Sequence, residues 1–497
     1  MALAWTLWFV FAGFGNHQDP LYWLYKYQHL EGGWMAVGTL LTGGAVVRIF
    51  GAELLPLRLF GWLCTVAAIV LPYCCLLDKE QRKANIHWLA LTLLLMGYGA
   101  FQEFSPGTLT VLLLSAIWVL ASKSYTIHYT PYIAAIAAGL AIAVRFPNIL
   151  VLLVLIPLWK KRSLWCVPIA AATAGLVYLL GYCFVNPAPM DAAMTSHDLW
   201  PMISKLWTNA GMLIGFILMG IGVLAIKSER IKELKNERVR GLAVGLTLVL
   251  FIAYTIKPTQ WYNIDLTYLI SALCIVIAAA ASKSSFSNYQ LPIGIAILAI
   301  ATLGTDTAWL KLFPAMLCLL PVAAAQYEKP MRRYVWWVMI PVTAMVMVRH
   351  STNSIGKNNL IQATTISAIS PYRGIAITEA QEARINQYKT DYKELKSERV
   401  LALGQENHLM RAVTGCEAAR YNEFWSNIYD SVYTAKYQTI IEAERPIVFC
   451  SFSPQFKTKP EYKDRQSAME NMLREHGYME IERSTYKYVV FIPKDYD

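Results

Sequence analysis

Hydrophobic residues dominate the first 350 positions, where they form runs separated by short polar stretches. Several runs approach the ~20 apolar residues that a helix needs to cross a bilayer. The pattern predicts a polytopic α-helical membrane protein with about thirteen transmembrane helices. The predicted helices cover residues 2–15, 57–77, 86–101, 108–121, 131–144, 148–158, 164–184, 210–226, 241–256, 264–281, 291–304, 308–325 and 334–349.

The pattern changes after residue 350. Residues 350–397 are polar and predict a connector with some helix. Beyond them, short apolar runs alternate with helical patterns, which is typical of a small α/β domain. We therefore predict a membrane domain over 1–349 and a soluble part over 350–497. The predicted strands are Arg399–Gly404, Pro446–Ser451, Met479–Glu482 and Tyr486–Ile492, and the predicted helices are Tyr433–Ala443 and Lys463–His476.

Composition agrees with a membrane protein. The 497 residues are 56% hydrophobic and only 15% charged, which is too apolar for a soluble globular protein. The net charge of +11 does not indicate nucleic-acid binding, because residues 350–497 hold 19 basic and 19 acidic residues. The excess lies in the membrane part, where basic residues report orientation.

Basic residues are unevenly divided between the loops. One alternate set of loops carries 17 Lys and Arg, and the opposite set carries 8. The positive-inside rule makes the first set cytoplasmic. The N-terminus is then cytoplasmic, and thirteen crossings leave everything after His350 outside.

Polar residues gather in the predicted outer loops, which hold eight of the fourteen acids of residues 1–349. A carboxylate at the mouth of a membrane bundle is costly unless it has a task. Convergence of carboxylates and cations on one face therefore indicates a site. The outer polar residues are Asp19, Glu31, Glu53, Glu103, Arg145, Asp191, His197, Asp198, Lys257, Tyr262, Asp265 and Asp306.

The first outer stretch, residues 16–58, contains Asp19, then Tyr22-Trp23-Leu24 and His29-Leu30, and further on Phe50-Gly51 and Arg58-Leu59. With these residues at this spacing, it resembles the first loop of the GT-C class of integral-membrane glycosyltransferases. The similarity is to the branch of protein O-mannosyltransferases and lipid A aminoarabinose transferases. Two shorter loops, Arg145–Pro147 and Lys257–Tyr262, are similar to later loops of that branch.

The chain departs from the family pattern at two places. Pro20 stands where the family has a second acid, and Met35–Gly38 replace an Asp-His-Pro-Pro element. These departures bear on which substrate is used and on whether the chain is active.

The resemblance implies transfer of a sugar from a polyprenyl-phosphate-linked donor to an acceptor hydroxyl, with inversion. The acceptor is a glycan, a lipid or a protein, and the reaction lies on the outer, periplasmic face of a bacterial inner membrane. An alcohol needs a base, and a leaving phosphate needs fixed positive charge. The implied catalytic residues are Asp19 as general base and Glu103, the donor-phosphate residues are Arg145, Lys257 and Tyr262, and the acceptor or cavity residues are Tyr22, His17 and Arg58. Beyond membrane lipids, the sequence assigns no further partner or cofactor and leaves a divalent metal open.

Each assignment has a simpler alternative. Asp19 before Pro20 suits the start of a helix. Arg145 and Lys257 suit interfacial anchors, and Glu103 suits an ordinary loop acid. For the whole chain, the alternatives are a transporter or flippase of lipid-linked sugars, or a non-catalytic membrane scaffold.

Overall fold

The computed structural model describes a large part of the chain. The described residues are 1–13, 19–97, 104–123, 128–187, 290–302, 308–326, 340, 343–344, 347, 360–395, 399–404, 407–414, 417–418, 431–451, 460–483 and 488–495.

Helices form the membrane part of these residues. The chain is a polytopic helical membrane protein, with three described segments long and apolar enough to cross a bilayer: Leu54–Leu76, Pro106–Lys123 and Phe146–Phe184. The apolar runs predicted at 210–226, 241–256 and 264–281 lie outside the described residues, so the count of thirteen remains a prediction. The helices are α1 (Ala2–Phe11), α4 (Leu54–Leu76), α5 (Lys79–Leu94), α6 (Pro106–Lys123), α7 (Thr130–Val144), α8 (Val151–Trp159), α9 (Ser163–Phe184), α16 (Gln290–Ala299) and α17 (Ala308–Ala324).

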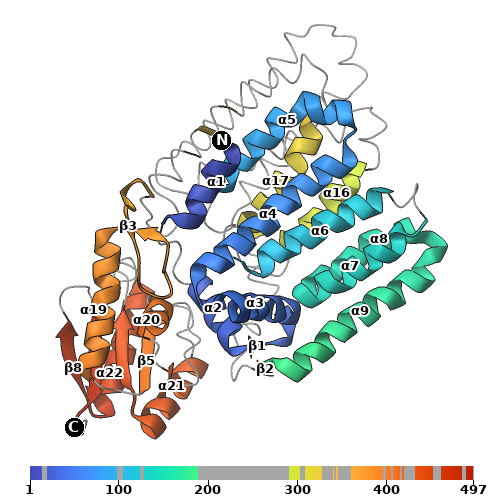
Figure 1. Cartoon of the computed structure of the whole chain (residues 1–497). Coiled ribbons are helices and arrows are strands. Elements are labelled where there is room, and N and C mark those ends of the chain that lie inside the picture. The colour runs from blue at the N-terminus through green and yellow to red at the C-terminus, as the bar shows by residue number, and fades with distance from the viewer. Residues whose placement is uncertain are drawn as a thin grey trace.

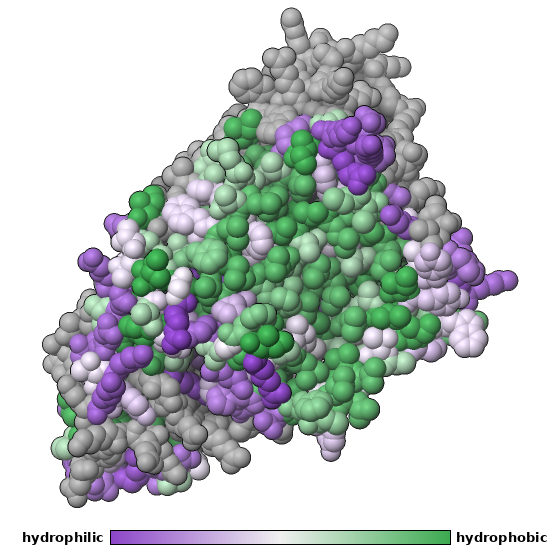
Figure 2. Space-filling view, viewed as in Figure 1, coloured by the Kyte–Doolittle hydropathy of each residue, from purple (hydrophilic) through white to green (hydrophobic). Residues whose placement is uncertain are grey.

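Close backbone approach holds the bundle together. A Cβ on Gly139 of α7 would lie 2.4 Å from the Ala170 carbonyl oxygen of α9, so these helices touch through glycine. Figure 2 shows hydrophobic side chains over the middle of the bundle, with hydrophilic groups beyond them at its ends. Such a belt is what a helix bundle presents to lipid.

Basic turns mark one end of the bundle, which we call the basic end. It includes the α4–α5 turn, where Asp78 caps α5 by accepting from the Gln81 amide at 2.7 Å. It also includes the turn η5 (Lys160–Arg162), where Arg162 contacts His128 at the start of α7. The predicted cytoplasmic loops of the described region thus share one end.

Two helices lie across the opposite end, which we call the α2–α3 end. They are α2 (Asp19–His29), which begins at the Asp-Pro pair that suits a helix start, and α3 (Val37–Phe50), which the sequence did not predict (Figure 1). Glycine permits their contact, since a Cβ on Gly43 would lie 2.4 Å from the Tyr27 ring. A short parallel pair, β1 (Glu31–Gly32) with β2 (Asn186–Pro187), ties the end of α9 to α2.

The C-terminal part contains a five-stranded sheet of order β6-β5-β7-β9-β8. The four predicted strands are present as β5, β7, β8 and β9, with β8 and β9 antiparallel. Domain boundaries at 349 and 350 remain a prediction, because residues 348–359 lie outside the described part. The elements are β3 (Thr365–Ile366), β4 (Ala376–Ile377), α19 (Glu379–Leu395), β5 (Arg399–Gly404), α20 (Asn407–Thr414), β6 (Glu417–Ala418), α21 (Ser431–Glu444), β7 (Ile447–Ser451), α22 (Pro460–Glu475), β8 (Tyr478–Arg483) and β9 (Tyr488–Pro493).

A single hydrophobic core joins α2 and α3 to the C-terminal part. Leu21 and Leu24 of α2 belong to the same buried cluster as Ile385, Leu409 and Val490. The backbone is joined as well, because the amide of Leu54 at the start of α4 donates to the Pro371 carbonyl at 2.9 Å. Helix α2 is therefore enclosed between the bundle and the C-terminal part (Figure 1).

Candidate active site at the α2–α3 end

Asp19 is the first residue of α2, with Pro20 second. Proline is tolerated in a first turn, and a carboxylate there is stabilised by the helix dipole. The side chain of Asp19 lies outside the described residues. Its place at the helix start is compatible with both the catalytic and the helix-start interpretation.

Arg58 joins the start of α4 to the residues that follow α1. It is the fifth residue of α4, only 2% exposed, and its Nη1 donates to the Gly13 carbonyl at 2.9 Å. The described contact of this predicted acceptor-side residue is therefore a buried hydrogen bond to the backbone.

Phe104, which follows Glu103 in the sequence, is held between α2 and α4. Its amide donates to the Leu57 carbonyl at 3.1 Å, and its carbonyl accepts from the Tyr27 hydroxyl at 3.2 Å. The Tyr27 and Phe104 rings also pack, with centroids 5.7 Å apart. Glu103 itself lies outside the described residues, but its neighbour belongs to the α2–α3 end.

Arg145 ends α7 at the same end of the bundle. Its Nη1 donates to the Ala301 carbonyl at 3.0 Å, beside the end of α16. The preceding Val144 carbonyl accepts from Thr39 of α3 at 3.0 Å. Arg145 is therefore hydrogen-bonded to the turn that follows α16, while its neighbour Val144 is hydrogen-bonded to α3.

Tyr22 faces the C-terminal part. The Tyr22 and His408 rings meet edge to face, with centroids 5.4 Å apart, and the Lys26 Nζ lies 4.6 Å from the Tyr22 centroid. The family resemblance implied an acceptor or cavity role for Tyr22, but no sequence pattern indicated that α20 would adjoin it.

One turn further along both helices, the guanidinium of Arg411 lies over the Tyr25 ring, with Cζ 3.3 Å from its centroid. Burial raises the pKa of the Tyr25 hydroxyl; Arg411 acts against this rise, and Glu31 adds to it. The hydroxyl therefore stays protonated and available as a donor at neutral pH.

The sequence pattern did not single out Lys26, His408 or Arg411 as site residues. In the structure all three are buried, each less than 10% exposed. The available signal was the strong amphipathicity of α20, whose apolar side packs on α2. A helix of eight residues inside a predicted soluble domain gave no indication that its partner lay near residue 22.

The structure brings Tyr22, Arg58, Arg145 and the start of α2 to one end of the bundle. Arg58 and Arg145 are attached to different elements there. His17, Lys257 and Tyr262 of the predicted site lie outside the described residues, as does the proposed loop from Lys257. In the described part of the chain, no group of three or more His, Cys, Asp or Glu side chains could hold a metal ion.

Fold and site together define a polytopic helical membrane protein with a polar, partly cationic end covered by a sheet-containing C-terminal part. No protein-family model and no curated protein sequence matches the chain. Two solved structures of ArnT from Cupriavidus metallidurans are similar along most of their length. The apo form has 13% identity and a TM-score of 0.42. The form bound to undecaprenyl phosphate has 12% identity and a TM-score of 0.43, and each alignment covers 99% of this chain and 96% of the other.

Proposed function

We propose that this protein is a GT-C type glycosyltransferase that moves a sugar from a polyprenyl-phosphate-linked donor to an acceptor hydroxyl. The supporting observation is the first loop. Its residues form one connected unit, because Leu24 of α2, Val47 of α3 and Leu57, which precedes Arg58 in α4, belong to the same buried cluster.

The reaction divides between a base and a set of cations. Asp19 takes the proton of the acceptor hydroxyl as the oxygen attacks the anomeric carbon. The bond from that carbon to the phosphate oxygen breaks, and the polyprenyl phosphate leaves with the electron pair. Arg145, with Lys257, stabilises the charge that develops on this phosphate.

Placement at the outer membrane face follows from the loop charges and is part of the proposal. The apolar belt of the bundle supplies the surface along which a polyprenyl tail lies. A periplasmic location in a bacterial inner membrane then puts the C-terminal part on the same side as the acceptor. Tyr22 belongs to the acceptor side of this proposed site, and Arg58 supports that side from the buried start of α4.

The substitution Asp19→Asn tests the proposal. As the first residue of α2, Asp19 interacts with the helix dipole, a contribution of about 0.3–1 kcal/mol. A helix-start role therefore predicts a small loss of stability in Asp19→Asn and little change in the rate of sugar transfer. Loss of a general base lowers the rate by about 10²–10⁴-fold. The protein in nanodiscs would be given undecaprenyl-phosphate-linked hexose, N-acetylhexosamine and aminopentose with lipid A, a Ser/Thr-rich peptide and a glycan as acceptors. Release of undecaprenyl phosphate by mass spectrometry is the measurement.

A matched control is Glu53→Gln, which removes another carboxylate at the same end, one that pairs with Arg373 at 3.7 Å. We expect release to fall only in Asp19→Asn, with undecaprenyl phosphate binding unchanged. Equal rates in wild type and Asp19→Asn would make Asp19 a helix-start residue. If the wild type releases no undecaprenyl phosphate with any donor and acceptor, the proposal that the protein is a glycosyltransferase is wrong. Movement of the intact donor from one leaflet of a vesicle to the other would instead support a flippase.

A further inference from the structure

Helices α2 and α20 are paired through two matched contacts. Tyr22 meets His408, and Tyr25 meets Arg411, so residues three apart on one helix contact residues three apart on the other. This register makes the two helices parallel, because residues three apart lie on the same helix face. Their starts, at Asp19 and Asn407, therefore lie at the same end of the pair.

Helix α20 is supported by the sheet of the C-terminal part. Helix α20 follows β5, which is hydrogen-bonded on both sides, to β6 and to β7. Its apolar residues Leu409, Met410 and Val413 are buried in the core shared with α2. The sheet thus provides a rigid base for α20, and α20 presents His408 and Arg411 to α2.

We propose that Arg411 and His408 are positioning residues that hold α2 in register, and that the C-terminal part is thereby an integral part of the transferase site. The proposal rests on the proposed function, because the position that matters is that of Asp19 relative to the acceptor hydroxyl. Arg411 and His408 act through Tyr25 and Tyr22.

Arginine suits this role for a physical reason. Its planar guanidinium stacks on an aromatic face and donates in its own plane, whereas a lysine ammonium is a point charge. The Tyr25 hydroxyl interacts with both Arg411 and Glu31, and Glu31 belongs to β1, the strand that joins α2 to the end of α9. Tyr25 consequently connects the C-terminal part with the bundle.

The decisive test compares the full-length variants Arg411→Gln and Arg411→Lys with wild type. Small displacements of reacting groups cost up to about 10²-fold in rate. We expect kcat for release of undecaprenyl phosphate to fall about 10- to 100-fold in Arg411→Gln, with the donor KM unchanged. Arg411→Lys should recover part of this loss. Tyr25→Phe, which keeps the ring and removes the hydroxyl, is the gentler variant if Arg411→Gln does not fold.

Hydrogen exchange of the amides of residues 19–29 provides a readout independent of activity. We expect faster exchange there in Arg411→Gln and no change in Arg474→Gln, an exposed arginine of α22 that pairs with Glu480. Wild-type kcat and unchanged α2 exchange in both Arg411 variants would overturn the positioning role while leaving the transferase intact. A parallel fall in kcat and thermal stability that Arg411→Lys does not relieve would reduce Arg411 to a structural residue. A wild-type protein that releases no undecaprenyl phosphate would instead contradict the proposed function.

Discussion

Arg145 has one observed contact and one proposed role. Its Nη1 donates to the Ala301 carbonyl, so one arm of the guanidinium is used to join α7 to η6 (Ile300–Thr302). A guanidinium has five N–H donors, so several remain for other acceptors. The alternatives of anchor and phosphate ligand are therefore compatible in a single arginine.

Replacement of Arg145 by Gln separates these tasks. A hydrogen bond to a charged group contributes about 1.5–3 kcal/mol, so we expect undecaprenyl phosphate to bind about 10- to 100-fold more weakly. Microscale thermophoresis of the protein in nanodiscs measures this affinity. Arg48→Gln is the control, because Arg48 is an exposed arginine at the same end, near the end of α3. Unaltered affinity in Arg145→Gln would leave Arg145 as an anchor.

The sequence predicted which residues are candidates for the site more readily than it predicted their hydrogen-bond partners. Loop charge and motif spacing predicted an outer position for Arg58 and Arg145, and the structure places both at the α2–α3 end. Their acceptors are the carbonyls of Gly13 and Ala301, and any residue has a carbonyl, so no sequence pattern indicates which one is used.

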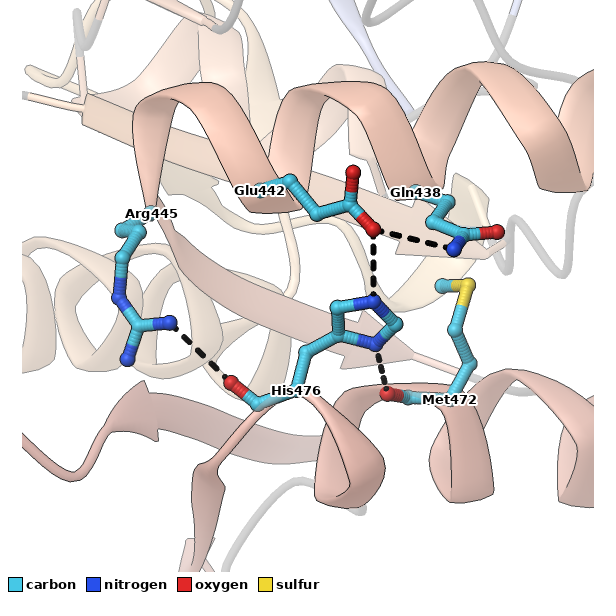
Figure 3. A network of polar contacts seen from close by, with 5 residues as sticks. All are labelled: Gln438, Glu442, Arg445, Met472 and His476. Carbon is cyan, nitrogen blue, oxygen red and sulfur yellow. Dashed lines mark hydrogen bonds and ion pairs between the residues drawn. The ribbon is translucent and has the colours of Figure 1, made fainter.

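At the scale of elements, the pairing of α21 with α22 depends on a charged histidine (Figure 3). His476 Nδ1 lies 2.8 Å from the Met472 carbonyl, and Nε2 lies 3.0 Å from a Glu442 carboxylate oxygen. Both acceptors lack a hydrogen in this arrangement, so both ring nitrogens act as donors when the ring is charged. Glu442 also accepts from Gln438 at 3.0 Å.

The stability of this contact should depend on pH. The pKa of His476 is raised by the Met472 carbonyl and by Glu442, with a smaller contribution from Glu475. The Gln438 amide and His476 lower the pKa of Glu442. A raised histidine pKa stabilises the fold below the unfolded value of about 6.5, and this is lost as pH rises through the folded pKa. The glutamate contribution is lost as pH falls through its lowered pKa.

We therefore expect α21 and α22 to exchange amide hydrogens faster at pH 8.5 than at pH 6, after correction for intrinsic exchange rates. His476→Gln keeps a donor for Glu442 but cannot become charged, and its corrected exchange should not change with pH. The same pH response in wild type and His476→Gln would exclude His476 as the titrating group.

Some helices and strands were easier to predict from the sequence than others. Strands β5 and β7 were predictable because compact apolar runs end at Gly404 and Ser451, whereas α3 was not. It contains Gly38, Gly43 and Gly44, which weaken helix propensity, yet these glycines permit the contact with α2 and α7. The pairing of β1 with β2 joins two-residue strands about 155 positions apart, which local pattern cannot detect.

The whole molecule has two chemically different ends. The basic end contains Lys160–Arg162, and the α2–α3 end is joined to the C-terminal part through Pro371 and Ala376. If the basic end is cytoplasmic, as the positive-inside rule states, the C-terminus lies outside. The hydrophobic pattern could predict the bundle, because helices that face lipid must carry apolar side chains. The attachment of the C-terminal part to α2 depends on particular side-chain contacts, which the hydrophobic pattern does not encode.

Alkaline phosphatase, which is active only outside the cytoplasm, tests this orientation. We expect activity when it is fused after Asp497 and none when it is fused to a chain ending at Arg162. The reverse result would invert the topology and move the proposed site to the cytoplasmic face.

The core shared by α2 and the C-terminal part also determines when the site can form during synthesis. Residues near 20 emerge from the ribosome early, but their partners in α19, α20 and β9 lie about 360 to 470 positions later. At about 5–20 residues per second, this separation corresponds to about 20 to 90 s. Helix α2 therefore acquires its full set of neighbours only when translation is nearly complete. A chain truncated before α19 lacks the C-terminal half of the core that covers α2, so the proposed site would be complete only in finished molecules.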